Sequence, residues 1–207
     1  INIFGVGYGV DWNGTLWVAV GGGLGANSNE FAYSYDGINW TGFGNSIFSL
    51  GGFGWGITWT GTRWVATGSG TNTIAYSSNG ISWTGLGVSI FTTVGYSVAS
   101  NYNSPATVYI QQPTIALGTG TNTIAYSTDG ILWSGLGTNI FSNTGRDCAW
   151  NGSIYVAVGS GTNTIAYSYD GLTWTGIGQS IFSSSGYGIS WNGTMWVAVG
   201  SGTNTIA

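Results

Sequence analysis

Few residues of this chain could do acid–base or nucleophilic chemistry: its 207 residues include six carboxylates, two arginines, one cysteine and no histidine. Hydrolysis of a glycoside needs two carboxyl groups roughly 5–10 Å apart. Three aspartates recur at equivalent positions of different repeats: Asp36, Asp129 and Asp170. We expect them on different structural units, where they cannot pair. Asp11 and Asp147 are at least two repeats apart, and Glu30 is the one carboxylate that could approach either of them.

The same inventory excludes other catalytic machinery. Arg63 and Arg146 lie in different repeats, so they do not form an arginine cluster for an acidic sugar substrate. Without histidine and with one cysteine, a zinc site or a nucleophilic triad cannot be assembled. Cys148 stands where other repeats have valine or isoleucine, and we expect a small buried hydrophobic residue there. The sequence therefore predicts no catalytic residue, no metal, no cofactor and a protein that is not an enzyme.

A repeat organises the whole sequence. Its Ile-Phe end recurs with spacings of 44, 43, 50 and 41 residues, at Phe4, Phe48, Phe91, Phe141 and Phe182. A period of this length indicates a propeller or a solenoid. With 39 glycines, 12 tryptophans, 12 tyrosines and no helical periodicity, the sequence predicts an all-β protein.

Four strands can be placed in each repeat from alternating apolar residues and turn residues. The first strand is expected at 8–12, 55–59, 96–100, 146–150 and 187–191, and in four repeats an Asn-Gly or Thr-Gly hairpin turn follows it. A Gly-rich loop with the sequence Thr-Asn-Thr joins the second strand to the third. It has neither the lysine nor the following helix of a P-loop, so we interpret it as turn chemistry. An Asp-Gly or Asn-Gly turn then leads into a fourth strand that is expected to end at Trp40, Trp83, Trp133 or Trp174.

These units predict one β-propeller domain over residues 1–207, built from four-stranded antiparallel blades. Five blades are expected, at 7–44, 54–87, 95–137, 145–178 and 186–207. The fifth lacks its outer strand, and a bare sheet edge is a liability. We therefore expect that the segment belongs to a larger chain or assembly, or that more blades complete the ring.

Two connections depart from the repeat. The loop between the second and third strands of the first repeat is four residues longer and carries Leu24 and Glu30. The turn after the first strand of the third repeat extends over 101–113, with Tyr102, Tyr109 and Gln111. Long loops on a rigid scaffold often bind ligands. Alternatively, these two loops are insertions without a function, at loop tips where insertions are tolerated.

The turn before each of these tryptophans carries a recurring motif. It reads Ser-Tyr-Asp-Gly-Ile-Asn-Trp at 34–40, with counterparts at 77–83, 127–133 and 168–174. The motif resembles the Asp-box repeats of β-propellers, known from sialidases and many non-catalytic proteins, but each copy is one residue shorter between Ser and Trp. It is also similar to repeats of bacterial surface, phage and large-virus proteins. The resemblance implies a structural hairpin opposite the ligand face, capped by Asp36, Asn79, Asp129 and Asp170. Because an asparagine cannot act as a base, the position requires an acceptor and not a charge.

A candidate binding surface lies at the start of the first strands, next to the expected mouth of the central channel. It takes one side chain from each repeat: Tyr8, Trp55, Tyr96, Arg146 and Tyr187. The loop asparagines are expected on the same face: Asn72, Asn122, Asn163 and Asn204. Aromatic rings beside hydroxyls and amides suit a neutral sugar. Alternatively, the rings pack between neighbouring blades, and Arg146 forms a local ion pair with Asp147.

Charge restricts the partners. Two cations cannot neutralise a run of phosphates, so we expect neither nucleic acid nor an anionic membrane surface as a partner. No apolar run approaches the roughly 18 residues needed to span a bilayer, so no membrane insertion is expected. The first hypothesis is a lectin-like or adhesion module that binds neutral glycans in an extracellular, cell-surface or virion setting. The alternative is a structural protein of a virion, phage tail or cell surface that contacts other proteins.

Overall fold

The computed structural model describes residues 3–23, 28–49, 51–102 and 112–207. Within these ranges the chain forms 18 β-strands and no helix, which confirms the all-β prediction. Accordingly, the described part contains no helix that is long and apolar enough to cross a membrane. Leu24, Tyr109 and Gln111 of the two long connections lie outside the described residues.

The strands fall into five repeats, which we number in chain order. Repeat 1 contains β1 (Val6–Trp12), β2 (Trp17–Gly22), β3 (Phe31–Ser34) and β4 (Thr41–Gly42). Repeat 2 contains β5 (Phe53–Trp59), β6 (Trp64–Ser69), β7 (Ile74–Ser77) and β8 (Thr84–Gly85). Repeat 3 contains β9 (Val94–Ala99), β10 (Thr114–Thr119), β11 (Ile124–Ser127) and β12 (Ser134–Gly135). Repeat 4 contains β13 (Thr144–Trp150), β14 (Tyr155–Ser160), β15 (Ile165–Ser168) and β16 (Thr175–Gly176). Repeat 5 contains β17 (Ser185–Trp191) and β18 (Trp196–Ser201).

Within each repeat, consecutive strands pair antiparallel in chain order. The turns between the first and second strands contain glycines such as Gly14 and Gly152, with φ of 101° and 100°. A residue with a side chain would be strained in this left-handed region, which explains the Asn-Gly signal.

The fourth strand is shorter and starts later than predicted. The sequence analysis placed its end at Trp40, whereas β4 begins at Thr41 and spans two residues. The indole N–H of Trp40 donates to the carbonyl of Gly37 at 3.1 Å, so the tryptophan closes the turn and does not extend the sheet. The prediction was wrong because a tryptophan at this point of an alternating pattern fits a strand end and a turn equally well.

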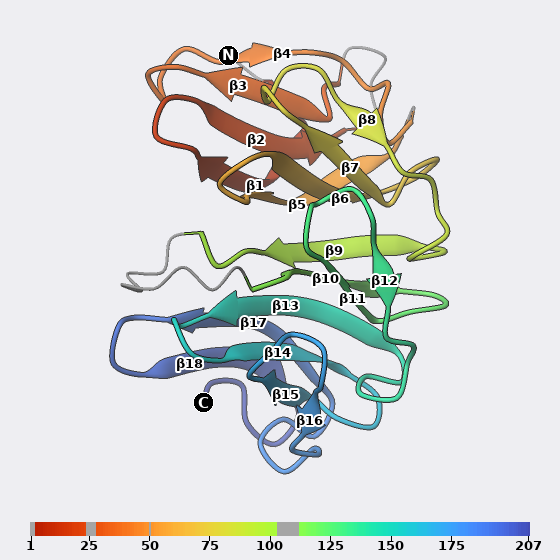
Figure 1. Cartoon of the computed structure of the whole chain (residues 1–207). Coiled ribbons are helices and arrows are strands. Elements are labelled where there is room, and N and C mark those ends of the chain that lie inside the picture. The colour runs from red at the N-terminus through yellow and green to blue at the C-terminus, as the bar shows by residue number, and fades with distance from the viewer. Residues whose placement is uncertain (1–2, 24–27, 50, 103–111) are drawn as a thin grey trace.

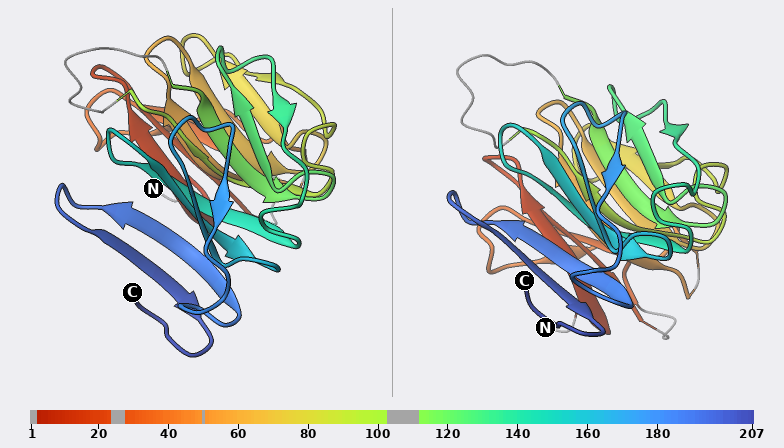
Figure 2. Two further views of the ribbon diagram at one scale, coloured as in Figure 1. Left: turned by 60° about the horizontal axis from the view of Figure 1, so that its bottom comes forward. Right: turned by 90° about the horizontal axis from the view of Figure 1, so that it is seen from below.

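The first strands of the repeats lie side by side through the molecule, and we call β1, β5, β9, β13 and β17 the inner strands. Each contacts the next in chain order (Figures 1 and 2). The repeats therefore follow one another as small sheets, and single ladder pairs such as Gly22↔Phe53 and Ser160↔Ser185 join a second strand to the next inner strand.

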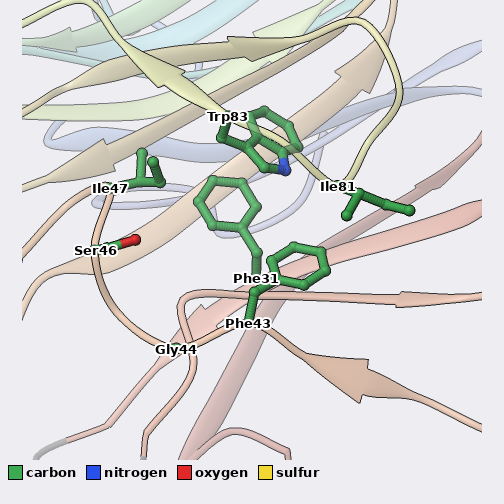
Figure 3. A pocket seen from close by; sticks show the side chains of 7 residues that line it. All are labelled: Phe31, Phe43, Gly44, Ser46, Ile47, Ile81 and Trp83. Atoms are coloured by element: carbon green, nitrogen blue, oxygen red, sulfur yellow. The ribbon is translucent and has the colours of Figure 1, made fainter.

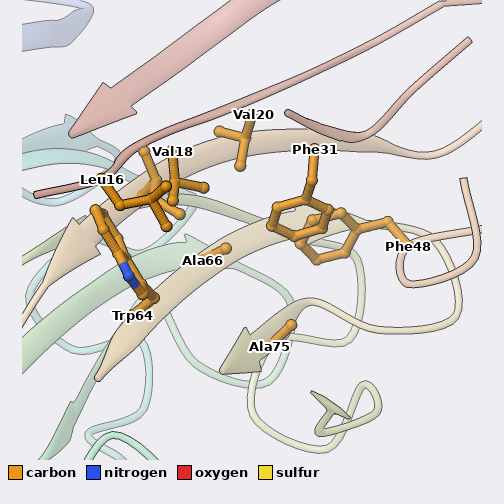
Figure 4. Close-up of a cluster of buried hydrophobic side chains, with 9 residues drawn as sticks. Leu16, Val18, Val20, Phe31, Phe48, Trp64, Ala66 and Ala75 are labelled. Atoms are coloured by element: carbon orange, nitrogen blue, oxygen red, sulfur yellow. The ribbon is translucent and has the colours of Figure 1, made fainter. Parts of the chain in front are cut away.

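Consecutive repeats pack face to face through apolar side chains. Between repeats 1 and 2, Val18, Val20 and Phe31 pack in one cluster with Trp64 and with two alanines of repeat 2 (Figure 4). Similar clusters lie between repeats 2 and 3, 3 and 4, and 4 and 5. Burial of this apolar surface is the main stabilising term for repeats that cannot each form a core alone.

The phenylalanine that ends each of repeats 1 to 4 is buried against a glycine, the next-to-last residue of a second strand. Phe141 is fully buried, and a Cβ added to Gly159 would lie 2.8 Å from its ring. Glycine is therefore required where the phenylalanine lies on the strand.

Candidate functional site

Every inner strand contains a β-bulge, and the residue that it leaves unpaired is one of the five side chains predicted from the sequence. In β5, for example, Gly54 pairs with Gly68 and Gly56 pairs with Thr67, so Trp55 has no partner across the ladder. The same register shift leaves out the other four: Tyr8, Tyr96, Arg146 and Tyr187. A bulge re-aims a side chain at the expense of a ladder pair, and bulges are over-represented next to functional sites.

The five bulged side chains form one continuous row across the repeats, which we call the bulge row. The rings of Tyr8 and Trp55 have centroids 4.2 Å apart, and those of Trp55 and Tyr96 are 5.7 Å apart. The Arg146 guanidinium carbon then lies 5.5 Å from the centroid of Tyr96 and 5.2 Å from that of Tyr187. The rings thus contact their neighbours between repeats, as the packing alternative predicted. Tyr8 and Tyr187 at the two ends are nevertheless 42% and 50% exposed.

The glycines around each bulge allow the inner strands to approach their neighbours. A Cβ on Gly54 would lie 2.7 Å from the Cβ of Val20 in the preceding repeat. A Cβ on Gly56 would lie 3.1 Å from the Cα of Ser97 in the following repeat. The Gly-aromatic-Gly pattern is therefore a packing requirement that brings bulges of successive repeats into contact.

Polar side chains tie each inner strand to the next beside the bulge row. Asp11 accepts from the backbone N–H of Trp59 at 2.7 Å and thereby joins β1 to β5. Thr58 and Ser100 share a hydrogen bond of 3.2 Å that links repeats 2 and 3. Asp147 accepts from the hydroxyl of Ser97 and from the N–H of Ile189, at 2.9 and 3.0 Å, so it joins β13 to both of its neighbours.

Arg146 and Asp147 do not use each other as partners. Asp147 is occupied by Ser97, Ile189 and the N–H of Cys148. The guanidinium lies between two tyrosines, and its Nε is buried with no hydrogen-bond partner within the described chain. The local ion pair considered from the sequence is thus replaced by two cation–π contacts. Desolvation raises the pKa of Asp147, and burial raises the pKa of the Cys148 thiol well above its usual range.

The loop asparagines make hydrogen bonds within the chain. The Asn72 amide N–H donates to the carbonyl of Ile47 in the connection from the preceding repeat, while its oxygen accepts from the N–H of Gly87 at 2.7 Å. Asn122 and Asn163 make the same pair of bonds, and Asn204 donates to Ile181. These amides hold the loops of successive repeats together; a role in ligand binding stays a prediction.

The loops nonetheless border the bulge row through their serines. The indole N–H of Trp55 donates to the hydroxyl of Ser69 at 3.3 Å, and Ser201 donates to the hydroxyl of Tyr187 at 3.3 Å. Both serines belong to Gly-Ser-Gly segments. The aromatic side chains and the loop hydroxyls therefore lie next to each other, as expected from the sequence.

The Ser-x-Asp-Gly turns are built alike in the four repeats that contain them. The Asp36 carboxylate accepts from the N–H groups of Ile38 and Asn39 at 2.8 and 2.7 Å, and Gly37 has a φ of 74°. Asn79 accepts from Ile81 and Ser82 at 2.9 and 2.8 Å. Asp129 and Asp170 make the corresponding bonds. The position requires an acceptor, and an amide serves as well as a carboxylate.

Glu30 lies within the connection of its own repeat. It is 1% exposed and accepts from the N–H groups of Ile47 and Phe48 at 3.0 and 2.8 Å. Later repeats use a threonine here, for example Thr73, whose hydroxyl donates to the carbonyl of Phe91 at 2.9 Å. Glu30 thus substitutes for a structural threonine. Among the described residues, no group of three or more His, Cys, Asp or Glu side chains could hold a metal ion.

A small pocket opens between repeats 1 and 2, away from the bulge row. It has a volume of about 130 Å³. One wall is made by Phe31 and Trp83, whose ring centroids are 4.2 Å apart, and Ile47 and Ile81 lie beside them (Figure 3). Its lining carries no charged side chain, so we interpret it as a packing defect of the interface.

Sequence reasoning missed two parts of this site. Phe53 extends the bulge row, because its ring lies 6.1 Å from that of Tyr8 and 5.7 Å from that of Trp55. The sequence suggested Asp147 only as an ion-pair partner of Arg146, but it joins three inner strands. The only sequence signal for this role was a carboxylate at a position where other repeats have glycine or serine.

Comparison with known proteins shows a fold and no family. No family model matches the sequence, and no curated protein matches it. Among solved structures, YCF48 bound to a D1 peptide has a TM-score of 0.63 at 13% identity, covering 100% of this chain and 67% of that chain. YCF48 from Cyanidioschyzon merolae has a TM-score of 0.61 at 16% identity, with coverages of 100% and 72%. The computationally designed Ika4 protein has a TM-score of 0.50 at 12% identity, with coverages of 80% and 91%. Because YCF48 is a β-propeller, this chain has a propeller-like, all-β antiparallel fold.

Proposed function

We propose that this chain is a non-enzymatic, protein-binding module in which five propeller blades, with Asp-box-like outer turns, present the bulge row to a partner. One observation carries the proposal: five equivalent bulges bring five side chains from five repeats into one row. The bulged side chains are not members of the apolar clusters that lie between the repeats. The consistent effect of the bulges is to re-aim one large side chain per repeat.

The composition of the row favours a protein partner. Tyrosine, tryptophan and arginine are the residues most enriched at energetic hot spots of protein interfaces. Arg146 adds a cation that has no carboxylate partner in the row, and a cation in this state attracts a carboxylate of the ligand. YCF48, which shares the fold, has been solved bound to a peptide, and this supports the same class of partner here.

Peptide display can test this proposal. A random peptide library selected on the immobilised protein should enrich aromatic peptides with an acidic residue. Arg146→Gln should weaken the binding of the selected peptides at least tenfold, which is a loss of about 1.4 kcal/mol in binding free energy. Arg63→Gln is the matched control, because this arginine lies over Tyr76 and outside the row. Equal affinities for the two variants would contradict the assignment.

A neutral glycan is the second candidate. It is favoured by the exposed rings of Tyr8 and Tyr187 and by the Ser201 hydroxyl next to Tyr187. Glycan-array binding that is lost in Tyr187→Ala but kept in Tyr169→Ala, a turn tyrosine that is 68% exposed, would select this alternative. Stable co-purification with a particle, with no binding on the glycan array and no peptide enriched by display, would instead favour a structural protein.

A further inference from the structure

The sequence contains four Asn-Gly pairs: Asn13-Gly14, Asn79-Gly80, Asn151-Gly152 and Asn192-Gly193. In such a pair the chain can attack itself, because the glycine has no side chain to hinder the approach. The backbone nitrogen of the glycine loses its proton and bonds to Cγ of the asparagine, and the side-chain amide leaves as ammonia. Water then opens the five-membered succinimide at either carbonyl and gives aspartate or isoaspartate. This deamidation needs no reagent besides water, so the structure around each pair decides its rate.

At all four pairs the asparagine side chain is folded back over the peptide bond that would react. Oδ1 of Asn13 accepts from the N–H groups two and three residues further along the chain, at 3.0 and 2.8 Å. Oδ1 of Asn79 does the same at 2.9 and 2.8 Å. The corresponding distances at Asn151 and Asn192 are all 2.9 Å. These donors stabilise the negative charge that develops on Oδ1 during the attack, so the carbon that is attacked is prepared alike at the four positions.

The glycine N–H groups, which supply the nucleophile, differ between the four pairs. The N–H of Gly80 donates to the hydroxyl of Ser77 at 2.9 Å, and Gly80 is buried. The N–H groups of Gly14, Gly152 and Gly193 donate to no acceptor within the described chain, and these glycines are half-exposed or exposed. A hydrogen bond from the N–H must break before the nitrogen can react, and burial shields the proton from base. Three pairs therefore have a free nucleophile, and the fourth does not.

We propose that Asn13, Asn151 and Asn192 are sites of spontaneous deamidation, and that the Ser77 hydroxyl protects Asn79 from the same reaction. The three sites share one place in the fold, the turn between the first and second strands of repeats 1, 4 and 5. This turn follows the end of the inner strand, whereas the bulge row lies near its start. Each conversion adds one negative charge, so three of them take the formal net charge from −4 to −7. Isoaspartate also adds a methylene group to the main chain, within a turn that is closed by a hydrogen bond from the asparagine N–H.

The serine of the other Ser-x-Asp-Gly turns holds the glycine in the same way. The N–H groups of Gly37, Gly130 and Gly171 donate to the hydroxyls of their turn serines at 2.9, 2.8 and 2.9 Å. An aspartate followed by glycine forms the same succinimide, with loss of water instead of ammonia, so these pairs are protected as well. The serine of the motif therefore keeps the turn chemically intact in addition to closing it.

Peptide mapping by mass spectrometry tests this inference on the whole folded protein, incubated in mildly alkaline water that is labelled with heavy oxygen. Each conversion incorporates the label. Asn13, Asn151 and Asn192 should deamidate faster than Asn79 by roughly tenfold or more, because Asn79 must first lose the hydrogen bond on its nucleophile. In denaturant the four pairs should react at similar rates, which controls for their different neighbours in the sequence.

Removal of the protecting hydroxyl gives a second test. Ser77→Ala should raise the deamidation rate of Asn79 by a similar factor, because the N–H of Gly80 loses its acceptor. Ser168→Ala is the matched control, since it removes the same hydrogen bond from the turn of repeat 4 and should leave the rate at Asn79 unchanged. Near-UV circular dichroism shows whether each variant is folded. If Ser77→Ala is not, the comparison of the four pairs in the wild type decides alone.

Three results would overturn the inference. The first is equal rates at Asn79 and at the three hairpin sites of the folded protein. The second is hairpin sites that react only in denaturant. The third is a folded Ser77→Ala variant in which Asn79 deamidates at its wild-type rate. None of these outcomes depends on whether the bulge row binds a partner.

Discussion

Replacing Trp64 with alanine will lower the free energy of unfolding by about 3–5 kcal/mol. Trp64 is fully buried and packs in one cluster with Leu16 and Val18 of repeat 1, so the change leaves a cavity between two repeats. The indole N–H of Trp64 has no hydrogen-bond partner within the described chain, so the loss comes from packing alone. Denaturant unfolding followed by circular dichroism measures the effect.

Trp17 is the matched control for this experiment. It occupies the equivalent position in repeat 1, where it is only partly buried. Trp17→Ala should therefore cost clearly less than Trp64→Ala. Trp64→Phe should recover much of the lost stability, because it refills the cavity without the unpaired N–H. Equal losses for the two alanine variants would show that the repeats do not stabilise one another face to face.

The folded state should be most stable in mildly acidic solution, at about pH 4–5, and less stable at neutral pH. Desolvation raises the pKa of Asp11, Glu30 and Asp147 in the folded protein. A group whose folded pKa exceeds its unfolded pKa contributes its full stability below the unfolded value, near 4, and loses that contribution as pH rises through the folded value. The three groups act in the same direction, so their effects add.

The turn aspartates limit the stability on the acid side. Hydrogen bonds from the turn, first from the N–H of Asn39, lower the pKa of Asp36, and the N–H of Thr173 does so for Asp170. At Asp129, burial raises the pKa, but the turn N–H groups and Arg63 together outweigh it. The stability from these groups is present above their unfolded pKa near 4 and is lost as pH falls toward the folded values.

Melting temperatures between pH 2 and pH 8 test both limits. Glu30→Gln should flatten the decline toward neutral pH, because it keeps an acceptor for Ile47 and Phe48 without a charge. Asp36→Asn should change the melting temperature only at acid pH. The variant should fold normally, since Asn79 already accepts the same hydrogen bonds in the equivalent turn of repeat 2. A stability that rises steadily from pH 4 to pH 7 would be incompatible with these pKa shifts.

Much of the fold was predictable because the turns have strong chemical requirements. Glycines such as Gly14 and Gly37 adopt positive φ at the places where the sequence indicated hairpins. The position of Trp40 was not predictable in this way, because its hydrogen bond to Gly37 decides between strand and turn. The alanine and valine side chains at the contacts between repeats could be recognised in the sequence only as part of an alternating strand pattern. That pattern does not show which neighbouring sheet packs on which face.

Five side chains of the candidate site could be selected from the sequence, but their geometry could not. Equivalence between repeats was enough to select Tyr8, Trp55 and Arg146, which the structure places in one row. The bulge itself gave no signal, because a glycine before the extra residue, and in three repeats a glycine after it, hide that residue from the alternating pattern. The partners of Asp147 and the internal bonds of Asn72 were likewise inaccessible, since each depends on a backbone group from another repeat.

Proton NMR tests most directly whether five repeats build one row. Nuclear Overhauser effects should connect Tyr8 with Trp55 and Trp55 with Tyr96, across separate repeats. The side-chain methylene protons of Arg146 should show such effects to both Tyr96 and Tyr187 and be shifted upfield by the ring currents. Effects confined to single repeats, with Arg146 at its random-coil shifts, would contradict the existence of the bulge row.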